Sequence, residues 1–190
     1  MTLGEMPPTP SVSMDRAIER RHQVRELFRK SIFESRVVVI TLGLIEAWYD
    51  NQSGIYLNEH PSFNMVKFYP GRFSFEVLGF DKSKKAIVDI VENLKEMRGD
   101  DIKIMMTVSP VPLQRTFTNF DVITANCYSK SMLRAVAGEV SGQYDFIDYV
   151  PSYEAVTWSE HSSTWLDDQV HVSEGRVSRV VDRIVETYTR

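Results

Sequence analysis

An acid and a histidine stand three residues apart near the end of the chain, at Asp168 and His171. On a turn that leads into a helix, this spacing lets the carboxylate accept a hydrogen bond from one nitrogen of the imidazole ring. The bond would fix the tautomer and leave the other ring nitrogen free as a general base. Asp167 is a rival carboxylate, and a surface acid beside a helix-capping histidine is the plain alternative. We carry forward the hypothesis that Asp168 and His171 are catalytic.

Gly43 and Glu46 follow a strongly apolar stretch of sequence. A glycine at a strand end lets the backbone approach a ligand and offer an amide N–H to an oxyanion, although a tight turn explains it equally well. An ionised Glu46 would oppose an oxyanion, so it must be protonated, paired or used for another purpose. Arg115 and Arg134 are possible partners for its carboxylate.

A second set of polar candidates is Ser109 and the segment 126–130. Ser109 could present its hydroxyl at a strand end, whereas the Pro-Val-Pro that follows could simply form a rigid loop. Asn126 is a candidate for substrate or oxyanion binding, and Asn126 or Ser129 is most simply a helix cap. Cys127 would need a base and a lowered pKa to act as a nucleophile, and only Lys130 is near in sequence. We expect a buried, inert thiol.

The other histidines are His22, His60 and His161, which are scattered and form no metal-binding motif. No Gly-x-Ser-x-Gly, Gly-Asp-Ser, phosphate-binding loop or dinucleotide-binding motif occurs. We therefore expect no metal and no cofactor. The sequence thus offers a base pair without a clear nucleophile for it to activate.

Strands and helices are predicted to alternate along the chain. Two β-branched stretches and a shorter one predict buried strands, and four amphipathic stretches predict helices. Residues 50–79 are predicted to form short strands or an ordered excursion rather than a helix. The helices are predicted over 15–35, 84–97 (capped by Asp81 or Ser83), 130–140 and 174–188, with Val177, Val180, Val181, Ile184, Val185 and Tyr188 facing the core, and the strands over 36–42, 101–108 and 145–150.

This order predicts an α/β fold with a parallel sheet, whose sites lie beyond the carboxyl ends of its strands. Three segments fall at that edge, residues 43–50, 109–116 and 151–171. A length of 190 residues suits one domain, here 13–190, after a disordered leader over 1–12 that contains three prolines.

The composition narrows the classes of partner and location. A net charge of −4 argues against a nucleic-acid-binding protein, which needs a basic surface. The longest apolar run, residues 37–45, is too short to span a membrane, and no signal peptide is visible. We expect a cytoplasmic protein that binds neither nucleic acid nor membrane.

Five blocks of sequence, taken together, resemble the GSCFA-domain family, which looks related to the SGNH or GDSL hydrolases. The resemblance runs from about residue 15 to the C-terminus. The blocks are ITLGLIEAW (40–48), TVSPVPL (107–113), ANCYSKSMLR (125–134), DYVPSYE (148–154) and DQVHVS (168–173).

The resemblance implies a flavodoxin-like, three-layer α/β/α fold of the SGNH-hydrolase type, with His171 similar to the catalytic base and Asp168 to its orienting acid. It places Gly43 where SGNH enzymes carry a Gly-x-Asn-Asp block, yet no Asn follows Gly43. The Gly-Ser-Cys-Phe-Ala motif that names the family does not occur in the chain. We expect the first strand and helix of the family pattern, with the nucleophile, to be missing.

Two functions from different classes follow from these observations. The chain is expected to be part of an acyl esterase or acyltransferase, acting on a small-molecule acyl or carbohydrate-linked ester, and to be inactive alone because the nucleophile segment is absent. Alternatively, it is an inactive domain that binds a ligand or partner, and an open sheet edge would then favour a homodimer. As a third possibility, Ser109 or Cys127 serves as the nucleophile.

Overall fold

The computed structural model describes residues 12–188. The predicted leader over 1–12 lies almost entirely outside these residues. Two units are distinguished within the chain, one ending at Arg36 and one running from Val37 onward, and each is described by itself.

The described part of the first unit is the helix α1 (Met14–Glu34). Its N-terminus is capped by Ser13, whose hydroxyl accepts a hydrogen bond from the Arg16 backbone N–H, and Asp15 lies in its first turn. The helix predicted over 15–35 is therefore confirmed. None of its residues is buried, and Leu27 and Phe28 are exposed.

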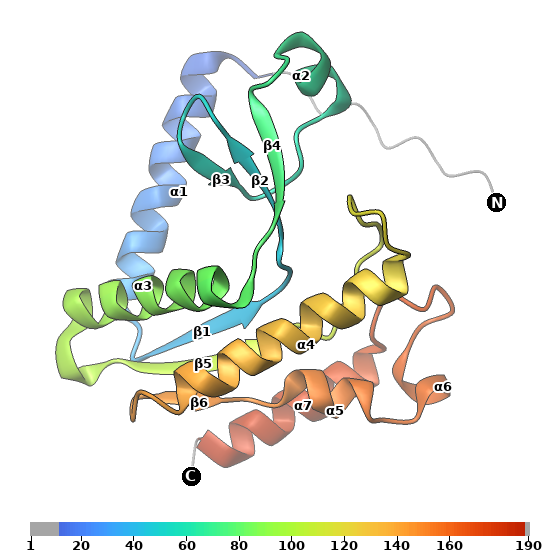
Figure 1. The fold of residues 1–190 in the computed structure, drawn as a ribbon. Helices are drawn as coiled ribbons and strands as arrows, with labels where there is room; N and C mark the ends of the chain where they lie inside the picture. Colours follow the sequence, from blue (N-terminus) through green and yellow to red (C-terminus); the bar gives the residue numbers. More distant parts are fainter. Residues whose placement is uncertain (1–11, 189–190) are drawn as a thin grey trace. The chain divides into compact units, whose positions relative to one another are not determined.

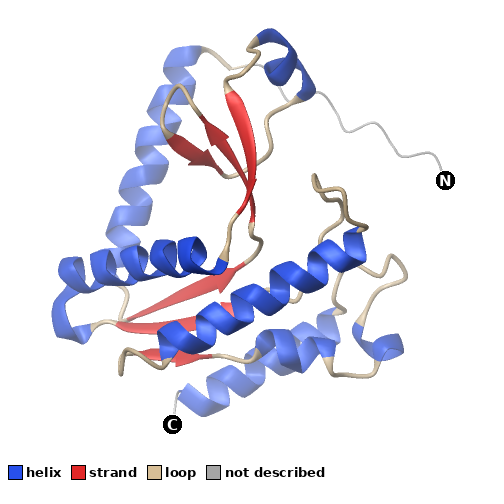
Figure 2. Ribbon diagram, in the orientation of Figure 1, coloured by secondary structure: helices blue, strands red, loops and turns tan. Residues whose placement is uncertain are grey.

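A three-stranded parallel sheet in the order β1-β5-β6 forms the centre of the second unit (Figures 1 and 2). Its strands are β1 (Val37–Leu42), β5 (Lys103–Val108) and β6 (Ile147–Tyr149). The predicted α/β class with a parallel sheet is confirmed. Among the described residues β1 pairs with β5 alone, so its other edge is open, and the expected homodimer stays a prediction.

Two helices cover one face of this sheet, α3 (Phe80–Arg98) and α4 (Val122–Ser141). α3 begins one turn earlier than predicted, at an N-cap formed by Gly79. The prediction that Asp81 or Ser83 caps it is wrong, because Asp81 lies inside the first turn and Ser83 is buried.

α4 also begins earlier than the predicted 130–140, because its cap is Asp121, which accepts a hydrogen bond of 2.9 Å from the Thr124 N–H. Asn126 and Ser129 therefore lie within the helix, and the prediction that one of them caps it is wrong. The first two turns were not predicted because residues 122–129 are mostly of types with low helix propensity.

Residues 46–77 form a second, antiparallel sheet in the order β3-β2-β4, made of β2 (Glu46–Asp50), β3 (Ile55–Leu57) and β4 (Phe73–Val77). The short strands expected there are confirmed, but a helix, α2 (Phe63–Phe68), also occurs. Asp50 is buried and accepts two hydrogen bonds from the Arg72 guanidinium, at 3.0 and 2.7 Å. This contact holds the pKa of Asp50 well below its ordinary value and ties β2 to the turn before β4.

The segment after β6 holds two short helices, α5 (Ser152–Thr157) and α6 (His161–Thr164), where a loop was predicted. The last helix, α7 (Glu174–Tyr188), has the predicted bounds. However, none of its residues is buried, and Val181 and Val185 are about half exposed, so the prediction that its apolar stripe lies in the core is wrong. The stripe lines two hollows rather than a closed core: the end of α7 lines one of about 500 Å³ with Val37 and Met105 of the sheet, and Val177, Val180 and Val181 line one of about 330 Å³.

The hydrophobic core lies instead between the parallel sheet and the pair α3 and α4. Its most buried side chains, all 0–1% exposed, come from β5, the residue before it, these two helices and the turn after β1: Ile45, Val91, Ile102, Ile104, Met106, Val108, Val136, Ala137 and Val140. Within the described residues, none of the helices is long and apolar enough to cross a membrane.

This core makes a stability prediction. Ile104→Ala should lower the free energy of unfolding by about 2–5 kcal/mol, because it removes methyl and methylene groups from a closed site. Ile123→Ala is the matched control, since Ile123 on α4 is 78% exposed and its truncation should change stability by less than about 0.5 kcal/mol. Urea unfolding measures both, and equal effects would place the core elsewhere.

Candidate functional site

Asp168 and His171 meet on the loop between α6 and α7. Nδ1 of His171 lies 2.5 Å from Oδ2 of Asp168, while Oδ1 accepts hydrogen bonds of 2.9 Å from the backbone N–H groups of Val170 and His171. These bonds, that from the His171 backbone foremost, lower the pKa of Asp168 to about 2. The carboxylate is therefore ionised at neutral pH, so Nδ1 of the ring must be the donor.

The loop itself is held by backbone contacts on both sides of the pair. The Leu166 N–H donates to the His171 carbonyl and the Ser173 N–H donates to the Thr164 carbonyl, each at 2.8 Å. Between them, Gln169 adopts a φ of 59°, in the left-handed region that side chains other than glycine rarely occupy. The turn at Gln169 lets one carboxylate reach both backbone N–H groups and the ring.

His171 borders a cavity of about 330 Å³ at the carboxyl edge of the parallel sheet. Pro110 and Val111, which follow β5, and Ser152, which follows β6, line this cavity with it. The side chain of His171 is 59% exposed, and within the part of the chain that the structure describes its Nε2 has no hydrogen-bond partner. The ring is thus fixed at one nitrogen and accessible at the other.

Gly43 directly follows β1 and is held from α4. Its carbonyl accepts a hydrogen bond of 2.9 Å from Nζ of Lys130, and the Ile45 N–H donates to the Ser129 hydroxyl at 3.2 Å. Lys130 and Ser129 are each 1% exposed, and burial lowers the pKa of Lys130 to about 8. Gly43 is not among the residues that line the cavity bordered by His171.

Glu46 is the first residue of β2 and pairs with neither of the arginines considered from sequence. Its two carboxylate oxygens accept hydrogen bonds from the Thr116 hydroxyl, at 2.5 Å, and from the Phe117 N–H, at 3.0 Å. Arg134 instead contacts Glu154, with 2.5 Å between Nε and Oε1. Arg115 lines the same cavity as Glu46 without forming an ion pair with it.

Ser109 and Asn126 hold the loop that follows β5. The Ser109 hydroxyl accepts a hydrogen bond from the Val111 N–H, and Oδ1 of Asn126 accepts one of 3.0 Å from the Leu113 N–H. Asn126 also lines a cavity of about 490 Å³ together with Asp168. Of the sequence candidates, Asn126 and Asp168 are thereby brought together.

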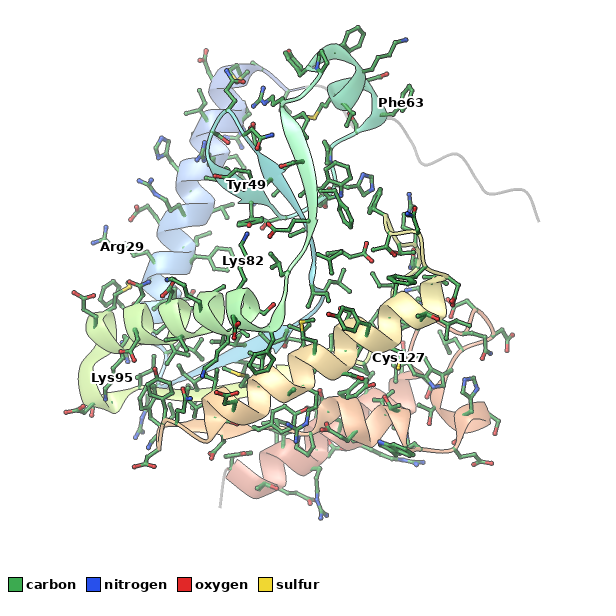
Figure 3. The ribbon with its side chains drawn as sticks, viewed as in Figure 1. Arg29, Tyr49, Phe63, Lys82, Lys95 and Cys127 are labelled. Atoms are coloured by element: carbon green, nitrogen blue, oxygen red, sulfur yellow. The ribbon has the colours of Figure 1, made fainter. Side chains whose placement is uncertain are left out.

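Cys127 is exposed on α4 (Figure 3). The prediction of a buried thiol is therefore wrong. Ala125, Ser129 and Leu133 are four residues apart and form part of the buried face of α4. Cys127 lies between them in the sequence and therefore on another face of the helix.

The burial of Ser129 and Lys130 was not predicted from the sequence. Ser129 is four residues from both Ala125 and Leu133, and this spacing was the available signal that it is buried. The residues 12–188 contain no cluster of three or more side chains able to hold a metal ion.

Fold and site together define an α/β protein with a carboxylate–histidine pair on a loop at the carboxyl edge of its parallel sheet. The chain belongs to the GSCFA family, whose model matches residues 7–184. No curated protein and no solved structure matches the chain.

The pKa of Asp168 predicts how the pair contributes to stability at different pH. Because the folded-state pKa is about 2 and the ordinary value is 3.8, the contribution is complete above pH 3.8 and is lost as the pH falls toward 2. The stability difference between the natural protein and Asp168→Asn should therefore shrink as the pH falls from about 4 toward 2. Chemical denaturation across this range measures the difference, and a constant value down to pH 2 would contradict the assigned bonds.

Lys130 predicts a pH dependence of the opposite kind. The pKa of its amine is about 8 in the folded protein and 10.5 ordinarily. Burial of the charged amine therefore lowers the stability of the folded state fully below pH 8, and this loss of stability disappears as the pH rises to 10.5. The natural protein should therefore gain stability relative to Lys130→Met between pH 8 and 10. Lys103→Met, on an exposed strand residue, is the control and should show no such gain.

Proposed function

We propose that the chain carries the base of an SGNH-like acyl-ester hydrolase or acyltransferase. The observation that supports this most is the pair itself, an ionised carboxylate 2.5 Å from Nδ1 of His171 with Nε2 unbonded beside a cavity. Asp168 holds the tautomer in which Nε2 is the basic atom. It also stabilises the imidazolium that forms when Nε2 accepts a proton.

In the proposed reaction, Nε2 of His171 removes the proton of an attacking hydroxyl or thiol. The attack on the acyl carbonyl forms a tetrahedral intermediate, and the imidazolium then returns the proton to the leaving oxygen. Asn126 is a candidate to bind the oxyanion, because it shares a cavity with Asp168, although His171 borders another cavity. Its Oδ1 already accepts from the Leu113 N–H, so its NH₂ group is what it can offer to a ligand in the cavity that Asp168 also lines.

The nucleophile is not assigned by contact. Among the described residues no hydroxyl or thiol is hydrogen bonded to the His171 ring. Ser152 lines the same cavity, but its hydroxyl is bonded to Thr107 and to the Val108 carbonyl. Ser109 and Cys127 stay as candidates for the nucleophile. A third candidate is a Ser or Cys from a segment with the family's Gly-Ser-Cys-Phe-Ala motif, which does not occur in this sequence.

The same observation favours a second candidate function. A His171 ring with no nucleophile against it suits a domain that binds a ligand in these cavities without converting it. Such a domain would use Asp168 and His171 as a fixed hydrogen-bonding pair rather than as a base.

Ester hydrolysis separates the two functions. If Ser109 or Cys127 serves as the nucleophile, p-nitrophenyl acetate and butyrate should be hydrolysed, and His171→Ala should lower kcat/KM by about 10²–10⁴-fold because the general base is removed. His161→Ala, on the exposed helix α6, is the matched control and should leave kcat/KM unchanged. Hydrolysis that survives His171→Ala would dismiss the pair as the base, and no hydrolysis by the natural protein would favour the binding domain.

The same preparation identifies the nucleophile. A fluorophosphonate probe and iodoacetamide are applied to the natural protein and to Ser109→Ala and Cys127→Ala, followed by mass spectrometry. A fluorophosphonate adduct that is lost in Ser109→Ala assigns Ser109. Because iodoacetamide labels the single exposed thiol in any case, Cys127 is assigned only if its alkylation and Cys127→Ala both abolish ester hydrolysis, and hydrolysis that survives in both variants excludes the two residues.

A further inference from the structure

A second cavity, of about 320 Å³, lies beside the candidate site and has a different character. It is lined by the start of β2, the residues that follow β3 and the loop that follows β5. This volume lies within the range of about 300–1,000 Å³ typical of small-molecule sites. None of its lining residues belongs to the Asp168–His171 pair.

One wall of this cavity is aromatic. Trp48 and Phe117 line it with ring centroids 5.2 Å apart and edge to face, and His60 contacts Phe117 at 5.4 Å. Phe75 supports both rings from behind, at 5.5 Å from Trp48 and 5.7 Å from Phe117. Such rings attract the polarised C–H groups of a ligand through the negative charge of their faces.

The remaining lining is mixed: Leu44, Leu57, Pro112 and Leu113 are apolar, and three of the polar side chains beside them are free to bind. Glu59, Gln114 and Arg115 line the cavity, and none of them forms a hydrogen bond or ion pair within the described residues. They offer donors and acceptors together. Nε1 of Trp48 is also buried without a partner among the described residues, which is uncommon for an indole donor.

The charges disfavour an anionic ligand. Glu46 and Glu59 place two carboxylates around the cavity against the single guanidinium of Arg115. A purely apolar ligand would leave the polar side chains without partners. A neutral ring with C–H faces and several hydroxyl groups satisfies both the aromatic wall and the polar lining.

We propose that this cavity binds a saccharide, with Trp48 and Phe117 against the sugar ring and Arg115, Gln114 and Glu59 bonded to its hydroxyl groups. The segment Pro112, Leu113 and Gln114 forms a wall of this cavity and also of the cavity that Asp168 lines. The two cavities are therefore neighbours, and we extend the proposal to a sugar ester whose acyl group reaches the cavity that Asp168 lines, while His171 borders a further cavity. That last step, a sugar ester as the substrate, rests on the proposed function, whereas binding of the sugar does not.

The indole N–H signals of the ¹⁵N-labelled protein test the proposal. The chain has three tryptophans, Trp48, Trp158 and Trp165, and Trp48→Phe identifies the signal of interest. The probes are the methyl β-glycosides of glucose, galactose and N-acetylglucosamine. At least one should shift the Trp48 signal with millimolar affinity while leaving the signal of the exposed Trp158 unchanged.

Two variants establish that the cavity is responsible. Arg115→Gln should weaken binding about tenfold by removing a charged donor, and Arg179→Gln on α7 should leave it unchanged. Phenol is added as an aromatic control probe. The proposal is overturned if no glycoside shifts the Trp48 signal or if Arg115→Gln binds a glycoside as the natural protein does. It is also overturned if phenol alone shifts the Trp48 signal, which would indicate a site for aromatic ligands.

The experiment also keeps this proposal apart from the ester chemistry. His171→Ala should bind the glycoside unchanged, because His171 does not line this cavity. Saccharide binding without ester hydrolysis would defeat the proposed function alone, and ester hydrolysis without saccharide binding would defeat this inference alone.

Discussion

The packing of α4 on the parallel sheet is the constraint on which the strand-end loops depend. Its buried stripe seals the core against β5, and the same helix reaches both loops that leave the sheet. Ser129 and Lys130 hold the turn after β1, and Asn126 holds the loop after β5. One helix therefore positions the walls of two cavities, because a rigid element supports a site more accurately than the loops could support themselves.

Lys130 shows that this packing is not arranged for stability alone. A buried amine bonded to a carbonyl, without a carboxylate beside it, is costly, and the lowered pKa reflects that cost. A methionine would fill similar volume without the charge. The contact that methionine cannot make is the one to Gly43, so the positioning of that turn is the physical reason we see for a lysine here.

Sequence reasoning succeeded where a pattern is local and failed where partners come from elsewhere. The parallel sheet and the bounds of α7 follow from periodicity, and the hydrogen bond between Asp168 and His171 follows from their spacing on a turn. The exposure of α7 did not follow, because a stripe of valines predicts an apolar face without specifying what covers it. The partners of Glu46 were likewise hidden, since Thr116 and Phe117 lie 70 and 71 residues away in the sequence.

The loop after β5 joins the two cavities that carry the functional argument. Its prolines end the strand and restrict the backbone, Asn126 fixes it from α4, and Thr116 and Phe117 fix its far end to Glu46. The carboxylate of Glu46 therefore supports the loop through these two hydrogen bonds, and both of its oxygens already have a partner there. A loop held at both ends keeps a fixed separation between the aromatic cavity on one side and the cavity that Asp168 lines on the other. Under the proposed ester chemistry, binding of a distal group in the first cavity would orient the reacting group, which is how binding energy away from the reacting atoms raises a rate.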